Sequence, residues 1–167
     1  MKCNGIFINY QCRSTSELGL PKDINPIDLK VVLFHELAHY NHHFCIDFTR
    51  KDKYFNWEGE GVAVFFAKDW GSSIPSDAKP ELISLLSDTG DYRDSYWVGY
   101  HALLLLNNKG VLDKVLKLSY TSDITDCIES VTQEGIDLFI TEWQNHCKSQ
   151  MINTMNTTVE LGGNLQA

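Results

Sequence analysis

Most apolar residues of this chain fall in segments that predict helices, because the residues that flank them are typical of helix starts and stops. The exception is GIFINY at positions 5–10, where β-forming residues are bounded by Gly and polar residues and predict one short strand. Residues 11–25 are rich in Ser, Arg, Glu, Gly and Pro, so a loop is expected there. The pattern therefore indicates a mainly α protein with at most a small amino-terminal β element.

The first long helix is expected to begin at Pro26 and to end near Phe44. Asn25 can cap its amino terminus, and proline is favoured at the first helical position because its missing N–H needs no partner there. The remaining helices are expected at residues 58–70, 80–87, 92–107, 111–119, 124–131 and 136–147. From about residue 150 the chain lacks periodicity, which predicts one domain over residues 1–150 and a frayed, disordered tail over residues 151–167.

Composition adds limits on the partners. The chain has 167 residues, 43% of them apolar, which suits a single domain that buries a core. Its net charge is −8, with 14 basic against 22 acidic residues, which argues against nucleic acid and anionic membranes as partners and favours a neutral or cationic substrate. No apolar run approaches the roughly 18 residues of a membrane span, and no signal peptide is recognisable, so a cytoplasmic location is expected.

Cysteine usage predicts free thiols. The five cysteines are odd in number and widely spaced, and no two of them form a C-x-x-C pair that would indicate a zinc ribbon or a redox site. Buried, unpaired cysteines are therefore expected, which fits a reducing compartment.

The strongest chemical signal is the H-E-x-x-H motif of residues 35–39, inside the first long helix. His35 and His39 lie four residues apart, about 40° around a helix, so they point the same way and can hold one metal ion between them. Glu36 sits at the flank of that face, which suits a general base acting on metal-bound water better than a ligand. The apolar run VVLF precedes the motif, and polar residues in a buried helix are costly without partners or a metal.

A third ligand has several candidates. The metzincin pattern is excluded, because it needs Gly and His where this chain has His42 and Cys45. The other pattern places a glutamate on the following helix, and NWEGEGVA offers Glu60 within W-x-x-E-G-x-A, with Glu58 as its competitor. His42 and His43 can also reach a metal by helix spacing, although solvated or outer positions near the helix end are expected for them.

HELAH followed by WEGEGVA resembles the gluzincin metallopeptidases, the thermolysin-like group that includes the zinc aminopeptidases. The resemblance covers roughly residues 27–147 and implies a zincin-like helical domain with an active-site helix, a glutamate helix and a carboxy-terminal helical bundle. It also implies a peptidase acting on peptides or proteins, with Zn²⁺ held by His35, His39 and Glu60 and with Glu36 as the catalytic base. Gly61 would let another backbone approach closely.

In such enzymes a Tyr or His from the later region hydrogen-bonds the oxyanion of the tetrahedral intermediate. Tyr96 is the preferred candidate, as the first Tyr of a Y-x-x-G-Y pattern with Gly99 and Tyr100. Tyr92, Tyr100 and His101 remain alternatives, and aromatic residues in an apolar helix most often serve only core packing.

Two other interpretations stay open. Glu60, Ala63, Phe66 and Ala67 also fit the E-x-x-A-x-x-F-A pattern of the small zinc peptidases that cleave phage and stress repressors, which implies the same three ligands. The second interpretation is a non-catalytic domain that holds a structural metal or binds a peptide. The chain departs from the gluzincins in having only 34 residues before His35 and no G-x-M-E-N signature, so amino-terminal exopeptidase specificity is not expected.

Overall fold

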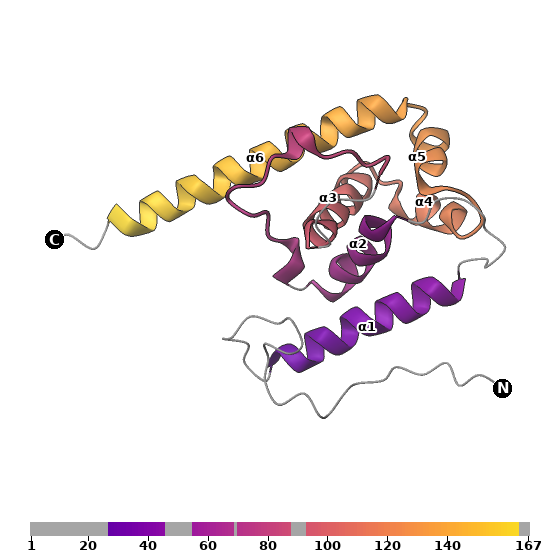
Figure 1. The fold of residues 1–167 in the computed structure, drawn as a ribbon, viewed down its shortest axis with the longest axis horizontal. Coiled ribbons are helices and arrows are strands. Elements are labelled where there is room, and N and C mark those ends of the chain that lie inside the picture. Colours follow the sequence, from indigo (N-terminus) through magenta and orange to yellow (C-terminus); the bar gives the residue numbers. More distant parts are fainter. Residues whose placement is uncertain (1–26, 46–54, 69, 88–92, 164–167) are drawn as a thin grey trace.

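The computed structural model describes residues 27–45, 55–68, 70–87 and 93–163, and every structural statement below concerns those residues. They are mainly helical and contain no strand, which confirms the predicted mainly α class. Figure 1 labels the six α-helices. Their bounds are α1 Ile27–Cys45, α2 Asn56–Ala67, α3 Asp94–Asn108, α4 Leu112–Ser119, α5 Ile124–Thr132 and α6 Ile136–Gly163, with 3₁₀ turns η1 at Trp70–Ser72 and η2 at Pro80–Leu82. The strand expected at residues 5–10 lies outside the described residues.

The helix expected from Pro80 is only one 3₁₀ turn, η2. After Leu82 the chain becomes extended, with φ −96° and ψ 134° at Ile83. In the turn that follows, Leu85 is fully buried, and its carbonyl accepts a hydrogen bond from the indole N–H of Trp57 at 3.1 Å. Tertiary packing therefore overrides the helical pattern of this segment.

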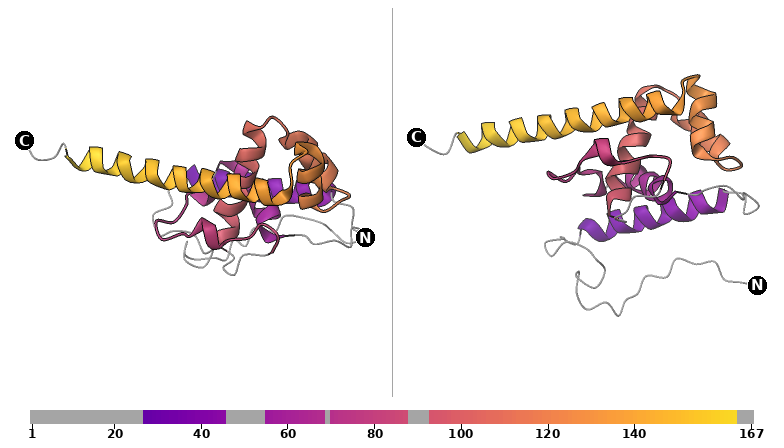
Figure 2. Two further views of the ribbon diagram at one scale, coloured as in Figure 1. Left: turned by 90° about the horizontal axis from the view of Figure 1, so that it is seen from above. Right: turned by 45° about the horizontal axis from the view of Figure 1, so that its top comes forward.

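The last helix is longer than expected. It was predicted to end at Cys147, before an irregular tail, but α6 continues to Gly163. No glycine or proline interrupts the sequence from Ile136 to Leu161, so nothing in this stretch breaks the helix. Both views of Figure 2 show α6 running past the other helices toward the carboxyl end of the chain.

The core is built around α3, which packs against α2, α4, α6 and η1. Three tryptophans are essentially fully buried: Trp57 of α2, Trp97 of α3 and Trp143 of α6. The rings of Trp97 and Trp143 are nearly parallel, with centroids 6.0 Å apart, and join α3 to α6. Cys127 and Cys147 are both buried, as expected for these two residues.

Two glycines set the distance between α2 and α3. A Cβ atom on Gly61 would lie 2.5 Å from the carbonyl carbon of Gly99, and one on Gly99 would lie 1.9 Å from the carbonyl oxygen of Trp57. No other residue fits either position without moving a backbone. The expectation that Gly61 lets another backbone approach closely is thus confirmed, and the partner is α3.

Helix α1 attaches to the rest of the molecule in an unusual way. It packs mainly against α2, yet its large apolar side chains Leu33, Phe34, Leu37 and Tyr40 are 36% to 50% exposed. Within residues 30–42 of α1, the buried positions are instead His35, at 9% exposure, and His42, at 4%. The contact between α1 and α2 therefore includes buried polar side chains, in contrast to an ordinary amphipathic helix.

Among the described helices, none is both long enough and apolar enough to cross a membrane.

Candidate metal site

Three side chains of the predicted ligand set converge where α1 crosses α2. His39 Nε2 lies 3.0 Å from His35 Nε2 and 3.2 Å from Glu60 Oε2, and His35 Nε2 lies 3.3 Å from the same carboxylate oxygen. The helical repeat explains the first distance, because residues four apart on α1 stack on one face. The other two distances follow from the packing of α2 on that face. The structure thus brings together His35, His39 and Glu60 as a group that could hold a metal ion.

The spacing of the three atoms fits a tetrahedral ion. Bonds of about 2.0–2.2 Å at tetrahedral angles require ligand atoms roughly 3.3–3.6 Å apart. The observed separations of 3.0–3.3 Å are at or slightly below that range, so only a small outward movement is needed to admit an ion. Three protein atoms also leave a fourth tetrahedral position for water or a substrate atom.

The group is largely shielded from water. Glu60 is 7% exposed and His35 9% exposed, so the carboxylate has lost most of its contact with water. A buried carboxylate is costly unless it is paired, hydrogen-bonded or bound to a metal. Without an ion, the tautomers of the two imidazoles decide which Nε2 atom donates to the other or to Oε2 of Glu60. A divalent cation would satisfy all three atoms at once.

Glu36, the predicted general base, is not part of the convergent group. It follows His35 directly on α1, and its side chain is exposed. It therefore lies beside the group with its carboxylate accessible to water, as expected for a residue at the flank of the histidine face.

Tyr96, the predicted oxyanion donor, is half-buried on α3 beside the group. Its ring stacks on that of His35, with centroids 5.8 Å apart and an interplanar angle of 24°. Tyr100 contacts Phe65 and His101 instead. Of the candidates within the described residues, Tyr96 is thus the one stacked on a member of the group, and Tyr92 lies outside those residues.

His101 belongs to a separate cluster between α3, α6 and η1. Its Nδ1 lies 3.1 Å from Nε2 of His146, and its Nε2 lies 3.0 Å from the carbonyl oxygen of Ser72. Burial, and next the neighbouring His146, lower the pKa of His101 to about 4, so its ring is neutral near pH 7. His101 therefore joins three elements and does not face the metal group.

A second pair lies at the same helix crossing, and the sequence did not assign its partners to each other. Glu58, the competitor for third ligand, is fully buried and faces His42, with Oε1 3.9 Å from His42 Nε2. Of the two positions expected for His42, solvated or outer, the structure excludes the solvated one, since His42 is 4% exposed; the side chain of His43 lies outside the described residues. The sequence held a usable signal for this pair. If two antiparallel helices place His39 opposite Glu60, then His42, about one turn later on α1, lies opposite Glu58, two residues earlier on α2.

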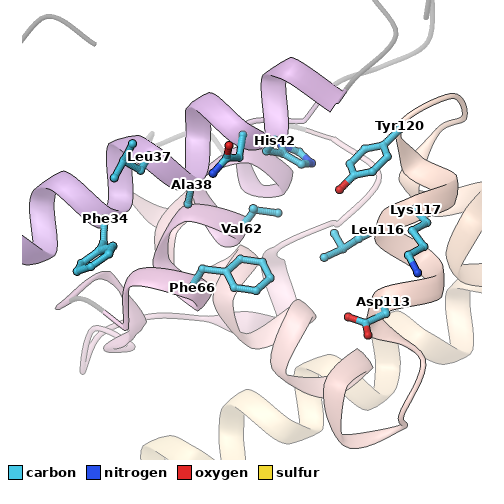
Figure 3. A pocket seen from close by; sticks show the side chains of 11 residues that line it. Phe34, Leu37, Ala38, His42, Val62, Phe66, Asp113, Leu116, Lys117 and Tyr120 are labelled. Atoms are coloured by element: carbon cyan, nitrogen blue, oxygen red, sulfur yellow. The ribbon is translucent and has the colours of Figure 1, made fainter. Parts of the chain in front are cut away.

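An apolar cavity of about 520 Å³ opens on another flank of α1. Figure 3 shows it between α1, α2 and α4, with Phe34, Val62 and Leu116 on its walls and with the rings of His42 and Tyr120 facing each other at one end. None of His35, Glu36, His39, Glu60 or Tyr96 lines it. The cavity and the metal group are therefore distinct features of the molecule.

Comparisons with protein-family models, with curated proteins and with solved structures each found no match for this chain. The likeness to the gluzincins therefore rests on the motifs and on the geometry of the three convergent side chains.

Proposed function

We propose that this protein is a zinc-dependent peptidase of the gluzincin type. The observation that carries the proposal is the convergence of His35, His39 and Glu60 from two helices, with their ligand atoms at near-tetrahedral separations. Two imidazoles and one carboxylate are the donor set of the His₂Glu catalytic zinc sites, which keep a fourth position open. When bound, zinc supplies a Lewis acid that polarises the scissile carbonyl and lowers the pKa of its water to about 7.

Each nearby side chain has a role in this proposal. Glu36 accepts a proton from the attacking water on its carboxylate and then donates it to the leaving amine. Its exposure supports this role, because a base must reach both water and substrate. The hydroxyl of Tyr96 donates a hydrogen bond to the oxyanion, an interaction worth about 3 kcal/mol in comparable sites. Its stacking on His35 holds that tyrosine beside the metal group.

The substrate class follows from charge. A net charge of −8 favours peptides or protein segments that are neutral or basic over acidic ones. A small zinc peptidase of the repressor-cleaving type would catalyse the same reaction on a different substrate, since its E-x-x-A-x-x-F-A pattern uses Glu60 as the same third ligand.

One observation favours a rival of a different class, a non-catalytic domain with a structural metal. Helix α1 buries histidines and exposes apolar residues, so a metal between His35, His39 and Glu60 would itself attach α1 to α2. The presence of Glu36 argues for catalysis, because a structural ion gains nothing from an exposed carboxylate next to its ligand.

The substitution Glu36→Gln distinguishes the zinc peptidase from the non-catalytic domain with a structural metal. In a peptidase this variant keeps its zinc and loses cleavage of a diverse peptide library, because the base is gone while the three ligands remain. Asp113→Asn, which neutralises another exposed carboxylate on α4, serves as the control and retains cleavage. A zinc-loaded wild-type protein that cleaves no peptide of the library would support the structural metal.

A further inference from the structure

His42 and Glu58 form a buried pair next to the metal group. Their side chains are 3% and 0% exposed, and the nearest nitrogen and oxygen atoms are 3.9 Å apart. His42 lies three residues beyond His39 on α1, and Glu58 lies two residues before Glu60 on α2. The pair thus spans the same two helices as the metal ligands, but neither residue belongs to the group that could hold the ion.

The placement of Glu58 is consistent with a fixed role. It lies in the first turn of α2, where the positive end of the helix dipole favours a carboxylate. Both side chains are buried between the same two helices, with Glu58 Oε1 3.9 Å from His42 Nε2. A shift of α1 along α2 would separate these two buried polar groups, and moving a buried polar group away from its surroundings is costly.

The metal group depends on that same position. Two of its members are on α1 and one is on α2, so all three atoms meet only in one register of the helices. Each residue of a helix adds about 1.5 Å of rise and 100° of rotation, so a slip of one residue would turn His35 and His39 away from Glu60. Four large apolar side chains of α1, those of Leu33, Phe34, Leu37 and Tyr40, are 36% to 50% exposed and so restrict this register less than buried side chains would.

We propose that His42 and Glu58 are positioning residues for the metal site: they fix the register of α1 on α2 so that His35 and His39 face Glu60 before the ion binds. This inference rests on the proposed zinc site. It concerns how that site is held ready, since a preorganised ligand set binds a metal more tightly than one that the metal itself must assemble.

A buried pair that served stability alone would behave differently. Its loss would lower the unfolding temperature but would leave the zinc affinity of the folded fraction unchanged. Loss of a positioning pair weakens zinc binding in protein that is still folded, and the two single substitutions have overlapping effects because either one breaks the same contact.

The test measures the zinc dissociation constant of the full chain by competition with a chelator of known affinity. The variants are Glu58→Gln, His42→Gln and the double substitution, each with far-UV circular dichroism to confirm that it is folded. We expect each single variant to bind zinc about 10- to 100-fold more weakly, the range found for outer partners of metal ligands, and the double variant to be little worse than either. The matched control is Lys109→Met, which removes ion pairs to Glu134 and Glu142 far from the site and should change the affinity less than twofold.

Hydrogen exchange without metal gives a second readout that does not require zinc. In metal-free wild type the amides of α1 should stay protected, and in Glu58→Gln they should exchange at least about tenfold faster while those of α3 do not change. If a glutamine variant proves unfolded, Glu58→Asp keeps the charge at a shorter reach, and the same comparison applies to it.

The outcomes separate this proposal from the peptidase proposal. Zinc affinities within twofold of wild type in both single variants would overturn the positioning role and leave the peptidase intact. Zinc binding that weakens as expected in a protein that cleaves no peptide would support the positioning role and overturn the peptidase. A wild type that binds no zinc, with unchanged α1 exchange in the variants, would overturn both.

Discussion

The Nε2 atom of His39 lies 3.2 Å from Oε2 of Glu60, although the two residues are 21 positions apart in the sequence. This contact joins the helix that carries H-E-x-x-H to the helix that carries E-G-x-A. It brings two separate sequence motifs together into one group that could hold a metal ion. The peptidase proposal depends on this contact.

Replacing the third ligand should abolish tight zinc binding. Glu60→Ala removes one of three protein ligands, so we expect the zinc affinity to fall by more than about 100-fold, beyond the loss caused by an outer partner. Chelator competition measures the change. Glu134→Gln, at a half-buried carboxylate that pairs with Lys109, is the control and should bind like wild type. A Glu60→Ala variant that binds zinc as tightly as the parent would place the third ligand elsewhere.

Zinc should stabilise the fold. A ligand present at 100 times its dissociation constant adds about 2.7 kcal/mol to the free energy of unfolding, which corresponds to roughly 5–10 °C for a chain of this size. Differential scanning fluorimetry with zinc and with a chelator measures the shift. His39→Ala should remove it, and an equal zinc-dependent shift in that variant would show that the ion binds at another place.

Tyr96 should affect turnover without affecting metal content. If its hydroxyl stabilises the oxyanion, Tyr96→Phe keeps the ring stacked on His35 but lowers kcat by about 100- to 1000-fold. Zinc content and peptide cleavage are measured on the same preparation. Cleavage at the wild-type rate would mean that Tyr96 serves packing only. Tyr100→Phe, whose ring contacts Phe65 and His101, is the control and should cleave normally.

The crossing of α2 and α3 should not tolerate a side chain at Gly99. A Cβ there would meet backbone at 1.9 Å, so Gly99→Ala should lower the free energy of unfolding by about 3 kcal/mol or more, at the upper end of overpacking effects. Urea denaturation measures the difference. Gly135 has open space around its Cβ position, and Gly135→Ala should cost no more than about 1 kcal/mol. Equal effects of the two substitutions would contradict the close contact.

Acid should destabilise the junction of α3, α6 and η1. The pKa of His101 is lowered from 6.5 to about 4 by burial, so the folded state keeps this ring neutral where the unfolded chain binds a proton. Stability from this group is therefore fully present above about pH 6.5, decreases as the pH falls, and is lost below about pH 4, by up to about 3 kcal/mol. Urea denaturation across this range in the presence of a chelator measures the loss. His101→Asn should show a shallower dependence, and an identical slope would contradict the assignment.

The sequence predicted those features that depend on local spacing. The helices that carry His35, His39 and Glu60 were predicted near their observed bounds, because histidine spacing and helix punctuation are local signals. Features set by tertiary packing were not predictable in this way. Leu85 is buried in a turn of a segment whose sequence pattern predicts a helix. Glu58 lies beside His42 only because α1 packs on α2. The full length of α6 was not predictable from periodicity, because the pattern is lost after about residue 150 although no breaker stops the helix before residue 162.

X-ray absorption at the zinc edge of the purified protein tests the central claim most directly, because it reports the identity of the atoms bound to the ion. The proposed site predicts about one zinc per chain with four light ligands: two imidazole nitrogens, one carboxylate oxygen and one water, at about 2.0–2.2 Å. Absence of zinc, or a shell of sulfur atoms at about 2.3 Å supplied by cysteines, would contradict it.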